Sequence, residues 1–235
     1  MIRETGSDSN STSLAQVAPD TSALSTMNIS EDEHFFDVDF ALTTRELARM
    51  FKESGVDFSH LSDEQFDSPL GASTGAAVIF GATGGVMEAA LRTAYEVFTG
   101  HTLPSLDFMS VRGMDGIKEA EIDLAGTKIK VAVVHTLKNA RQILEQIENG
   151  TSPYVFIEVM TCPGGCLGGG GQPIPTNWET RKKRAESIYL EDLNKILRKS
   201  HENLEVLNLY QDFLKKPLDE LSHHLLHTHY LERGL

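Results

Sequence analysis

The sequence predicts an α/β fold, in which a parallel or mixed sheet is flanked by helices and wrapped by an all-helical C-terminal segment. Two apolar runs, residues 128–134 and 154–160, have the length of strands that are covered on both faces. Residues 137–147 lie between them and have helical periodicity. This strand–helix–strand order is typical of a parallel pair joined by a crossover helix.

The N-terminal part predicts a tail followed by a helix. Residues 1–35 are rich in Ser, Thr, Asn and Asp, so they offer little apolar area to offset the entropy of ordering, and we expect a disordered tail. Thr43 and Glu46 have the spacing of a capping box, in which each side chain accepts a hydrogen bond from the backbone of the other. A helix over residues 44–54 is therefore expected.

A glycine-rich stretch and a longer helix come next. Residues 71–85 contain five glycines and predict a loop. Helical periodicity resumes at Val86 and continues to Gly100, a residue type that commonly ends helices. Residues 106–111 are predicted to form a third strand.

The C-terminal part predicts helices only. Residues 178–235 carry apolar stripes at helical spacing and no strand pattern, and they are too few to form a separate core, so we expect them to pack on the α/β part. Residues 181–184 form the one basic run, which predicts a surface patch able to meet an acidic ferredoxin or a partner subunit.

Composition narrows the class of protein. A chain of 235 residues buries a sizeable core without disulfides. Its net charge of −13 argues against a nucleic acid or an anionic membrane surface as partner. The sequence starts without an apolar targeting segment, and no apolar run is long enough to span a bilayer. We therefore expect a cytoplasmic location without membrane insertion.

The only two cysteines, Cys162 and Cys166, lie in a glycine-rich stretch directly after a predicted buried strand. Ligand sites collect at the carboxyl ends of parallel strands. Two thiolates at this spacing can reach two corners of one iron–sulfur cluster, and the glycines let the backbone approach it closely. From spacing alone, a zinc site, a disulfide, a glycine-rich anion nest and an ordinary turn remain alternatives.

Other ionisable residues have simpler interpretations. Glu158 lies in an apolar strand, which indicates either a structural hydrogen bond or proton handling, and we favour the first. Glu88 is expected on the polar face of its helix, and His135 is expected to be a hydrogen-bonded core histidine. Four histidines within residues 223–229 include one pair at helical spacing that could bind a metal, although a solvated or capping role is favoured.

Residues 154–173, YVFIEVMTCPGGCLGGGGQP, resemble the third cluster-binding signature of the iron-only (diiron) hydrogenases. Residues 73–92 are similar to the glycine-rich loop and helix of that family. Further similar segments fall in family order: residues 42–50, 111–120, 198–201 and 225–230. The resemblance starts near residue 36 and reaches the end of the chain.

The resemblance implies three parts and one cofactor. Residues 36–177 would be the C-terminal α/β lobe of the large subunit, and residues 178–235 a helical segment like the small subunit, after the tail of residues 1–35. The cofactor implied is the H-cluster, a 4Fe-4S cluster bridged by a cysteine sulfur to a diiron centre that carries CO, cyanide and a dithiolate. Cys162 matches a ligand of the four-iron part, and Cys166 matches the bridging cysteine.

The same resemblance implies the surroundings of the cofactor. Met160 matches a methionine beside the diiron site and is grouped with Cys166 as a catalytic residue. Phe80 and Gly81 match residues that line the pocket, and Gly165 is grouped with the cofactor-binding residues. The implied activity is the reversible reduction of protons to H2, linked to ferredoxin or NAD, in an anaerobic and reducing context.

The resemblance has a gap, because members of the family hold the cluster with four cysteines and this chain has two. The upstream cysteine motifs are missing, and residues 30–36, SEDEHFF, stand where the second would be. We therefore expect a second chain that carries those motifs, together with ferredoxin or another redox subunit. A non-catalytic binding or sensory relative without a diiron centre is the alternative. Hydrogenase-like iron–sulfur assembly factors rank below it, because they lack a close version of residues 111–116.

Overall fold

The computed structural model describes residues 38–68, 70–124 and 126–227. The chain divides into two units, Met1–Ala41 and Leu42–Leu235, and the fold reported below belongs to the second. The tail predicted for residues 1–35 lies outside the described residues. Within the described ranges, no helix is both long enough and apolar enough to cross a membrane.

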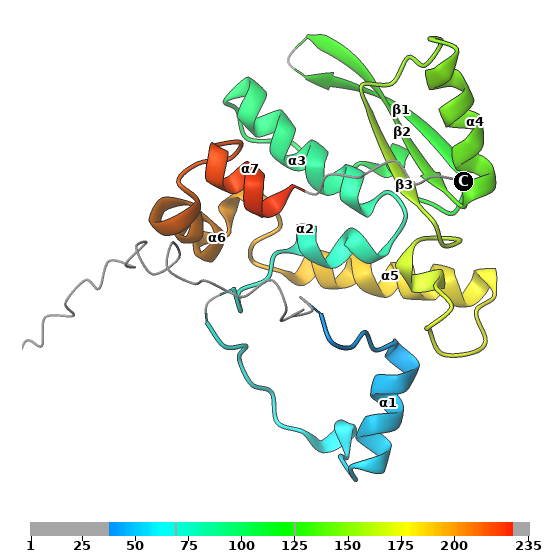
Figure 1. Ribbon diagram of the computed structural model, residues 1–235, viewed down its shortest axis with the longest axis vertical. Coiled ribbons are helices and arrows are strands. Elements are labelled where there is room, and N and C mark those ends of the chain that lie inside the picture. Colours follow the sequence, from blue (N-terminus) through cyan, green and yellow to red (C-terminus); the bar gives the residue numbers. More distant parts are fainter. Residues whose placement is uncertain (1–37, 69, 125, 228–235) are drawn as a thin grey trace, which may run out of the picture. The chain divides into compact units, whose positions relative to one another are not determined.

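The centre of the fold is a three-stranded mixed sheet with the order β1-β2-β3 (Figure 1). Strand β1 (Ile117–Leu124) pairs antiparallel with β2 (Thr127–His135), and β2 pairs parallel with β3 (Phe156–Met160). Helix α4 (Leu137–Glu148) connects the parallel strands. This arrangement confirms the predicted fold class and the strand–helix–strand unit.

The strand predicted at residues 106–111 is wrong, and β1 takes its place in the sheet. Residues Met109–Val111 form a 3-10 turn instead, in which the Val111 N–H donates to the Phe108 carbonyl at 3.0 Å. Val111 is buried in the core, so its apolar character reflects packing rather than strand pairing. In β1, buried residues alternate with charged exposed ones, because one face of the strand meets solvent.

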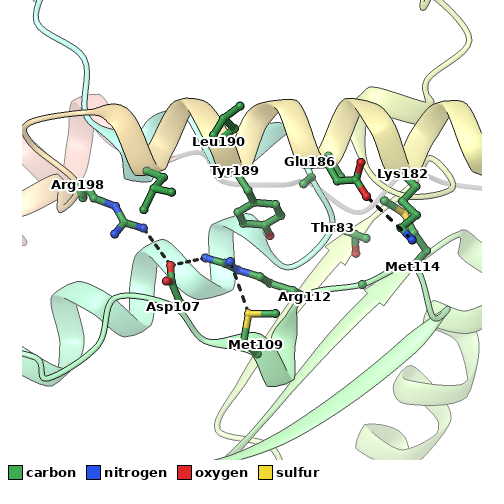
Figure 2. Close-up of a pocket in the computed structure, with 14 residues that line it drawn as sticks. Thr83, Asp107, Met109, Arg112, Met114, Lys182, Glu186, Tyr189, Leu190 and Arg198 are labelled. Atoms are coloured by element: carbon green, nitrogen blue, oxygen red, sulfur yellow. Dashed lines mark hydrogen bonds and ion pairs between the residues drawn. The ribbon is translucent and has the colours of Figure 1, made fainter.

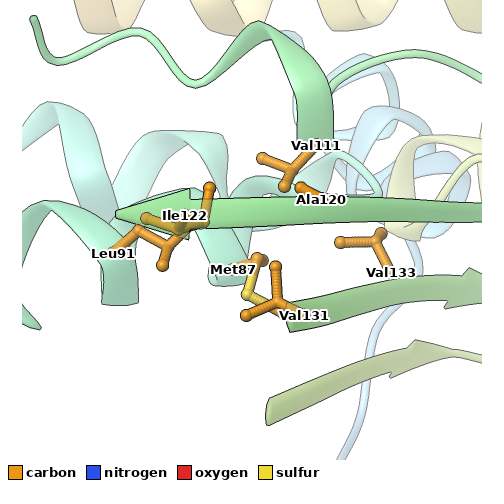
Figure 3. Packing of buried hydrophobic residues seen from close by; sticks show 7 residues of the cluster. All are labelled: Met87, Leu91, Val111, Ala120, Ile122, Val131 and Val133. Carbon is orange, nitrogen blue, oxygen red and sulfur yellow. The ribbon is translucent and has the colours of Figure 1, made fainter. Parts of the chain in front are cut away.

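The core lies on both faces of β2. Val131 and Val133 pack with Met87 and Leu91 of α3 (Gly85–Thr99), as Figure 3 shows. Ala132 and Val134 pack on the other face with residues of α4. Full coverage, predicted for both parallel strands, is therefore confirmed for β2 only.

The corresponding prediction for β3 is wrong. Phe156 keeps 43% of its surface exposed and Val159 keeps 52%, because β3 lies at the edge of the described sheet. Val155, just before the strand, is also exposed. The nearly continuous apolar run of β3 therefore leaves apolar side chains exposed along the strand that leads to residue 161.

Two of the N-terminal helices agree with the predictions. Helix α1 (Thr44–Glu53) has the capping box between Thr43 and Glu46. Helix α3 begins one residue before Val86 and ends at Gly100, whose left-handed backbone caps it. The stretch predicted as a loop also contains α2 (Gly75–Val78) and a 3-10 turn (Ile79–Gly81).

The described C-terminal residues are helical, as predicted. Helix α5 (Trp178–Asn194) packs against α2 (Figure 1), and its Ala185 is buried against Ala82 and Leu167. Two shorter helices follow, α6 (Leu204–Leu209) and α7 (Glu220–Leu226), with a π-turn between them. Helix α5 therefore covers the segments that carry the candidate site.

Candidate functional site

The candidate site centres on residues 161–171, called the cysteine loop here, which follow β3 directly. Tight turns shape this loop: the Gly165 N–H donates to the Cys162 carbonyl and the Gly169 N–H to the Cys166 carbonyl, each at 3.0 Å. Both cysteines are free thiols; Cys162 is half-buried and Cys166 is exposed. The predicted position after the parallel strand is confirmed, and the disulfide alternative is not formed.

Gly165 brings three of the predicted site residues together. Its φ of +96° is in the left-handed region, and a Cβ atom there would lie 2.8 Å from the Gly81 carbonyl oxygen and 2.9 Å from the Met160 Sδ atom. The same Cβ would lie 2.7 Å from the Thr83 nitrogen. Only glycine fits such a close approach of two backbones without displacing one of them.

A second glycine-rich segment, residues 81–85, faces the cysteine loop and is called the glycine loop here. The two loops are joined by a hydrogen bond of 3.0 Å from the Thr83 N–H to the Gly164 carbonyl. Phe80, just before the glycine loop, keeps 46% of its surface exposed, and Gly81 is half-buried. The structure therefore brings Gly81, Met160 and Gly165 together, with the exposed Cys166 following Gly165 in the chain.

Glycines also keep space beside the thiols. A Cβ atom on Gly169 would lie 3.7 Å from the Cys162 Sγ atom and 3.1 Å from the Cys166 carbonyl oxygen. A Cβ atom on Gly170 would meet nothing within 4 Å. A side chain at residue 169 would therefore press on the Cys166 carbonyl oxygen and would touch the Cys162 thiol at an ordinary contact distance.

Two arginines from helices hold the cysteine loop. Arg184 of α5 donates to the Leu167 carbonyl at 2.9 Å and to the Pro173 carbonyl at 2.7 Å. Arg45 of α1 donates to the Gly170 carbonyl at 2.8 Å. Residues 181–184 are predicted to form a surface patch. This is wrong for Arg184, because its guanidinium group donates hydrogen bonds to the Leu167 and Pro173 carbonyls. Sequence reasoning missed Arg45, since no local pattern marks a contact with a loop so far along the chain.

Glu158 of β3 makes the structural hydrogen bonds that we favoured. The residue is 6% exposed, and its carboxylate accepts from the Gly84 N–H at 2.6 Å and from the Met87 N–H at 2.7 Å. It therefore caps the first turn of α3, where backbone N–H groups lack helical partners. Burial raises the pKa of Glu158, and the hydrogen bonds from Gly84 and Met87 only partly oppose this rise.

Lys118 of β1 reaches the same loop from the neighbouring side. It is 7% exposed, and its Nζ atom donates to the Thr83 carbonyl at 3.1 Å and to the Gly113 carbonyl at 2.9 Å. Burial lowers the pKa of Lys118 to about 8, although the carboxylates of Glu158 and Asp115 oppose the shift. Sequence reasoning missed Lys118; its inward position in an alternating strand is the signal that could have revealed it.

The prediction for Glu88 is wrong, because this residue is fully buried in an ionic network. Arg92 donates to Glu88 at 2.7 Å and to Asp192 at 2.8 Å, and Arg112 donates to Glu88 at 2.6 Å. The network contains three carboxylates and three guanidinium groups: Glu88, Asp107, Asp192, Arg92, Arg112 and Arg198.

The ionic network ties α5 to α3. Burial alone would raise the pKa of Asp192, but its hydrogen bonds from Arg92 and Arg198 outweigh this effect and hold the pKa below its usual value. The carboxylate therefore stays charged at neutral pH. Because Asp192 belongs to α5 and Arg92 to α3, the network connects the helical C-terminal segment to the α/β part.

A cavity of about 650 Å³ lies between α5 and residues 107–114 (Figure 2). Its walls are mostly apolar, and the Arg112 guanidinium stacks 4.1 Å above the ring of Tyr189 inside it. Burial raises the pKa of Tyr189, and the carboxylate of Glu88 adds to this effect. Thr83 of the glycine loop lines the cavity, whereas neither cysteine does, so the thiols do not face into it.

The histidines have structural surroundings. His135 is buried, and its Nε2 atom lies 3.1 Å from the Met114 carbonyl oxygen, in agreement with a core histidine. The rings of His223 and His227 stack with their centroids 4.4 Å apart. Among the described residues, the side chains close enough to share a metal are instead Glu96, His201 and Glu202. Lys199 already pairs with both of those carboxylates.

A free cysteine pair on a glycine-rich loop at the end of a parallel strand defines a candidate cluster-binding protein of the α/β class. Two family models identify the family. The model described as the iron only hydrogenase large subunit, C-terminal domain, matches residues 25–170, and the iron hydrogenase small subunit matches residues 178–233. The chain belongs to the iron-only hydrogenase family.

Individual relatives agree with this assignment. The chain is 56% identical over 198 residues to the NADP-reducing hydrogenase subunit HndD of Solidesulfovibrio fructosivorans. The aligned region covers 84% of this chain and 34% of the relative. It is 59% identical over 138 residues to the periplasmic Fe hydrogenase large subunit of Nitratidesulfovibrio vulgaris, covering 59% of this chain and 33% of the relative. The chain thus spans about a third of the length of these relatives.

The fold is also similar to a solved structure. A variant of the FeFe-hydrogenase HydA1 from Chlamydomonas reinhardtii superposes with a TM-score of 0.66 at 41% sequence identity. The superposition covers 83% of this chain and 56% of that structure. The mixed sheet and its flanking helices are therefore those of an FeFe-hydrogenase domain.

Proposed function

We propose that this chain forms part of an iron-only hydrogenase active site and supplies the third cysteine motif that holds the H-cluster. The activity is the reversible reduction of protons to H2. The observation that carries the proposal is the contact between the cysteine loop and the glycine loop. The family resemblance assigned Gly81, Met160 and Gly165 from separate segments, and Gly81 and Met160 both approach Gly165 closely there.

The donor set fits half of such a cofactor. In this proposal Cys162 is a ligand of the 4Fe-4S part, and Cys166 ligates the same part and bridges to the diiron centre with its CO, cyanide and dithiolate ligands. Gly169 lies next to the Cys162 thiol, and a Cβ atom there would meet the Cys162 Sγ atom at 3.7 Å, so the backbone passes close to the thiol. When bound, the diiron centre supplies the electron transfer and the bond making.

The other residues would shape the pocket. Gly165 lets Met160 approach the loop that carries Cys166, so the thioether would form an apolar wall there. Phe80 and Gly81 would line the same pocket, where the aromatic ring would help to exclude water. A dry surrounding strengthens hydrogen bonds to the cofactor and limits its exposure to oxygen.

Two further thiolate ligands must come from sequence outside these 235 residues, and we propose that a second chain with the upstream cysteine motifs supplies them. Exposed apolar side chains support this, since Phe80 precedes the glycine loop and Val159 lies near the end of β3. Electrons would come from ferredoxin or another redox subunit, in a ferredoxin- or NAD-linked reaction.

Anaerobic reconstitution tests the proposal. The full chain is combined with a polypeptide that carries the upstream motifs, with iron, sulfide and a synthetic diiron precursor. We expect bound iron and infrared bands of CO and cyanide, loss of these bands in C166S, and reduced iron in C162S. The G170A variant is the matched control, because a Cβ at this position meets no atom within 4 Å. Absence of iron in the wild-type complex would refute the proposal.

The second candidate is a non-catalytic binding or sensory subunit without a diiron centre. The observation that favours it is the presence of only two cysteine ligands in the chain. The same infrared measurement decides between the two, because a complex that assembles with the partner chain but shows no CO or cyanide bands supports the second candidate.

We also propose a cytoplasmic and reducing location, which suits the exposed thiol of Cys166. Cell fractionation with an antibody against the chain tests this location. Release of the chain by osmotic shock would indicate the periplasm instead.

A further inference from the structure

Two buried charged residues, Glu158 and Lys118, converge on the backbone of the glycine loop. Neither Glu158 nor Lys118 touches the cysteine loop through any hydrogen bond described above. Both instead bond to the backbone of the glycine loop. Buried charges are costly unless they are paired and hydrogen-bonded, so two of them aimed at one loop need an explanation.

The two side chains hold a single peptide group. The Thr83 carbonyl accepts from Lys118 at 3.1 Å, and the Gly84 N–H of the same peptide donates to Glu158 at 2.6 Å. An ammonium group thus lies at the oxygen end of the peptide dipole and a carboxylate at its nitrogen end. Both contacts are charge-assisted hydrogen bonds, which are the stronger kind, and together they fix the plane of the peptide.

The next peptide towards the N-terminus carries the contact with the cysteine loop. The Thr83 N–H donates to the Gly164 carbonyl at 3.0 Å. Gly165 leaves no room for adjustment, because even a Cβ atom there would lie 2.7 Å from the Thr83 nitrogen. The orientation of the clamped peptide is therefore transmitted through Thr83 to the backbone that precedes Cys166.

We propose that Glu158 and Lys118 are positioning residues that clamp the Thr83–Gly84 peptide and thereby hold the cysteine loop in its ligand-binding geometry. The proposal rests on the proposed function in one respect only: the geometry that the clamp holds is the one in which the cysteines would bind a cluster. The clamp itself is a property of the chain, and it can be measured without any iron.

Hydrogen exchange of the full wild-type chain is the first test. We expect the amides of residues 83, 84 and 87 to exchange as slowly as those of Val131–Val134 in the buried strand, although they lie in or beside a glycine-rich loop. Exchange as fast as that of residues 62–67, which are exposed and form no helix or strand, would overturn the clamp.

The second test compares variants by hydrogen exchange and by the alkylation of each cysteine with iodoacetamide under reducing, anaerobic conditions. In E158Q and K118M, peptides that cover residues 81–87 should exchange about tenfold faster, and the ratio of the Cys166 to the Cys162 alkylation rate should change about threefold or more. The exposed neighbours supply matched controls, E119Q on β1 and K130M on β2, which should keep wild-type values.

Loss of the whole fold is recognised from faster exchange in Val131–Val134. If E158Q unfolds, the measurements on K118M still test the clamp, since this variant retains both hydrogen bonds that the helix start donates to Glu158. If both variants unfold, the exchange rates of residues 83, 84 and 87 in the wild-type chain alone support or overturn the clamp. Wild-type exchange and an unchanged alkylation ratio in both variants would overturn the proposal.

Iron loading separates this inference from the proposed function. The variants are also assembled with the partner polypeptide, and bound iron is measured. Altered exchange and alkylation together with no iron in the wild-type complex would refute the proposed function and leave the clamp intact. Normal iron in the wild-type complex, with both variants unchanged in exchange and alkylation, would refute the clamp alone.

Discussion

At the scale of single residues, Gly165 lets the cysteine loop and the glycine loop approach each other closely, and its replacement tests how tightly the two loops fit. In G165A the new Cβ meets backbone atoms of Gly81 and Thr83 at 2.8 and 2.7 Å, and neither can rotate away. With the strain of a positive φ added, we expect a loss of about 1–3 kcal/mol of unfolding free energy. Urea unfolding measures it, with G170A as the neutral control. Equal stability of the two variants would show that the loops can separate freely.

Lys118 should give the chain a distinct pH dependence. Since burial lowers the pKa of Lys118 to about 8, the folded chain releases this proton before the unfolded chain, whose lysine has a pKa of 10.5. Between these pH values the unfolded state binds more protons, so stability rises with pH. The unfolding free energy of wild type relative to K118M should therefore increase from pH 8 to 10.5, by up to about 3 kcal/mol. A constant difference would mean that Lys118 titrates normally in the folded state.

Residue-level predictions from sequence succeeded where a residue contrasts with its neighbours and failed where it does not. Cys162 and Cys166 stand out because glycines surround them, and Glu158 stands out because its strand is apolar. No such local contrast marks Arg45, which bonds to a carbonyl 125 residues away. Glu88 was misplaced for a related reason: it lies on a helix face that is buried by arginines rather than by apolar residues.

At the scale of elements, local signals predicted helices well and strands less well. The capping box placed the start of α1, and Gly100 placed the end of α3, because capping is decided by neighbours in sequence. Strand pairing is decided by distant partners. Residues 106–111 looked like a strand but include a turn that packs on the core. Strand β1 was overlooked because Lys, Glu and Asp are uncommon in strands and a lysine occupies one of its buried positions.

Strand β3 lies at the edge of the described sheet and is partly exposed, and we expect the proposed partner chain to cover it. A strand followed by a ligand loop is expected to be covered on both faces in a complete α/β sheet. Here β3 has a partner on one side only among the described residues, and Phe156 and Val159 remain exposed. Sequence alone could not reveal this, because burial by a partner chain and burial within the chain select the same apolar residues.

At the scale of the whole molecule, the ionic network between α3 and α5 makes the two family segments interdependent. The boundary predicted between residues 36–177 and 178–235 is crossed by the pair of Arg92 and Asp192, whose side chains are fully buried. Removing one partner of a buried pair leaves the other charge uncompensated. We therefore expect both segments of the wild-type chain to unfold in one cooperative transition.

The R92M variant tests this coupling, because it leaves the carboxylates of Glu88 and Asp192 without their shared guanidinium. We expect a loss of about 3–5 kcal/mol of unfolding free energy. The single tryptophan, Trp178, begins α5 and reports on the C-terminal segment by fluorescence, while far-UV circular dichroism reports on the whole chain. The two urea transitions should coincide in wild type and separate in R92M, with fluorescence changing first. R141M, at an exposed position of α4, is the matched control and should behave as wild type. Coincident transitions and unchanged stability in R92M would show that apolar packing alone joins the two segments.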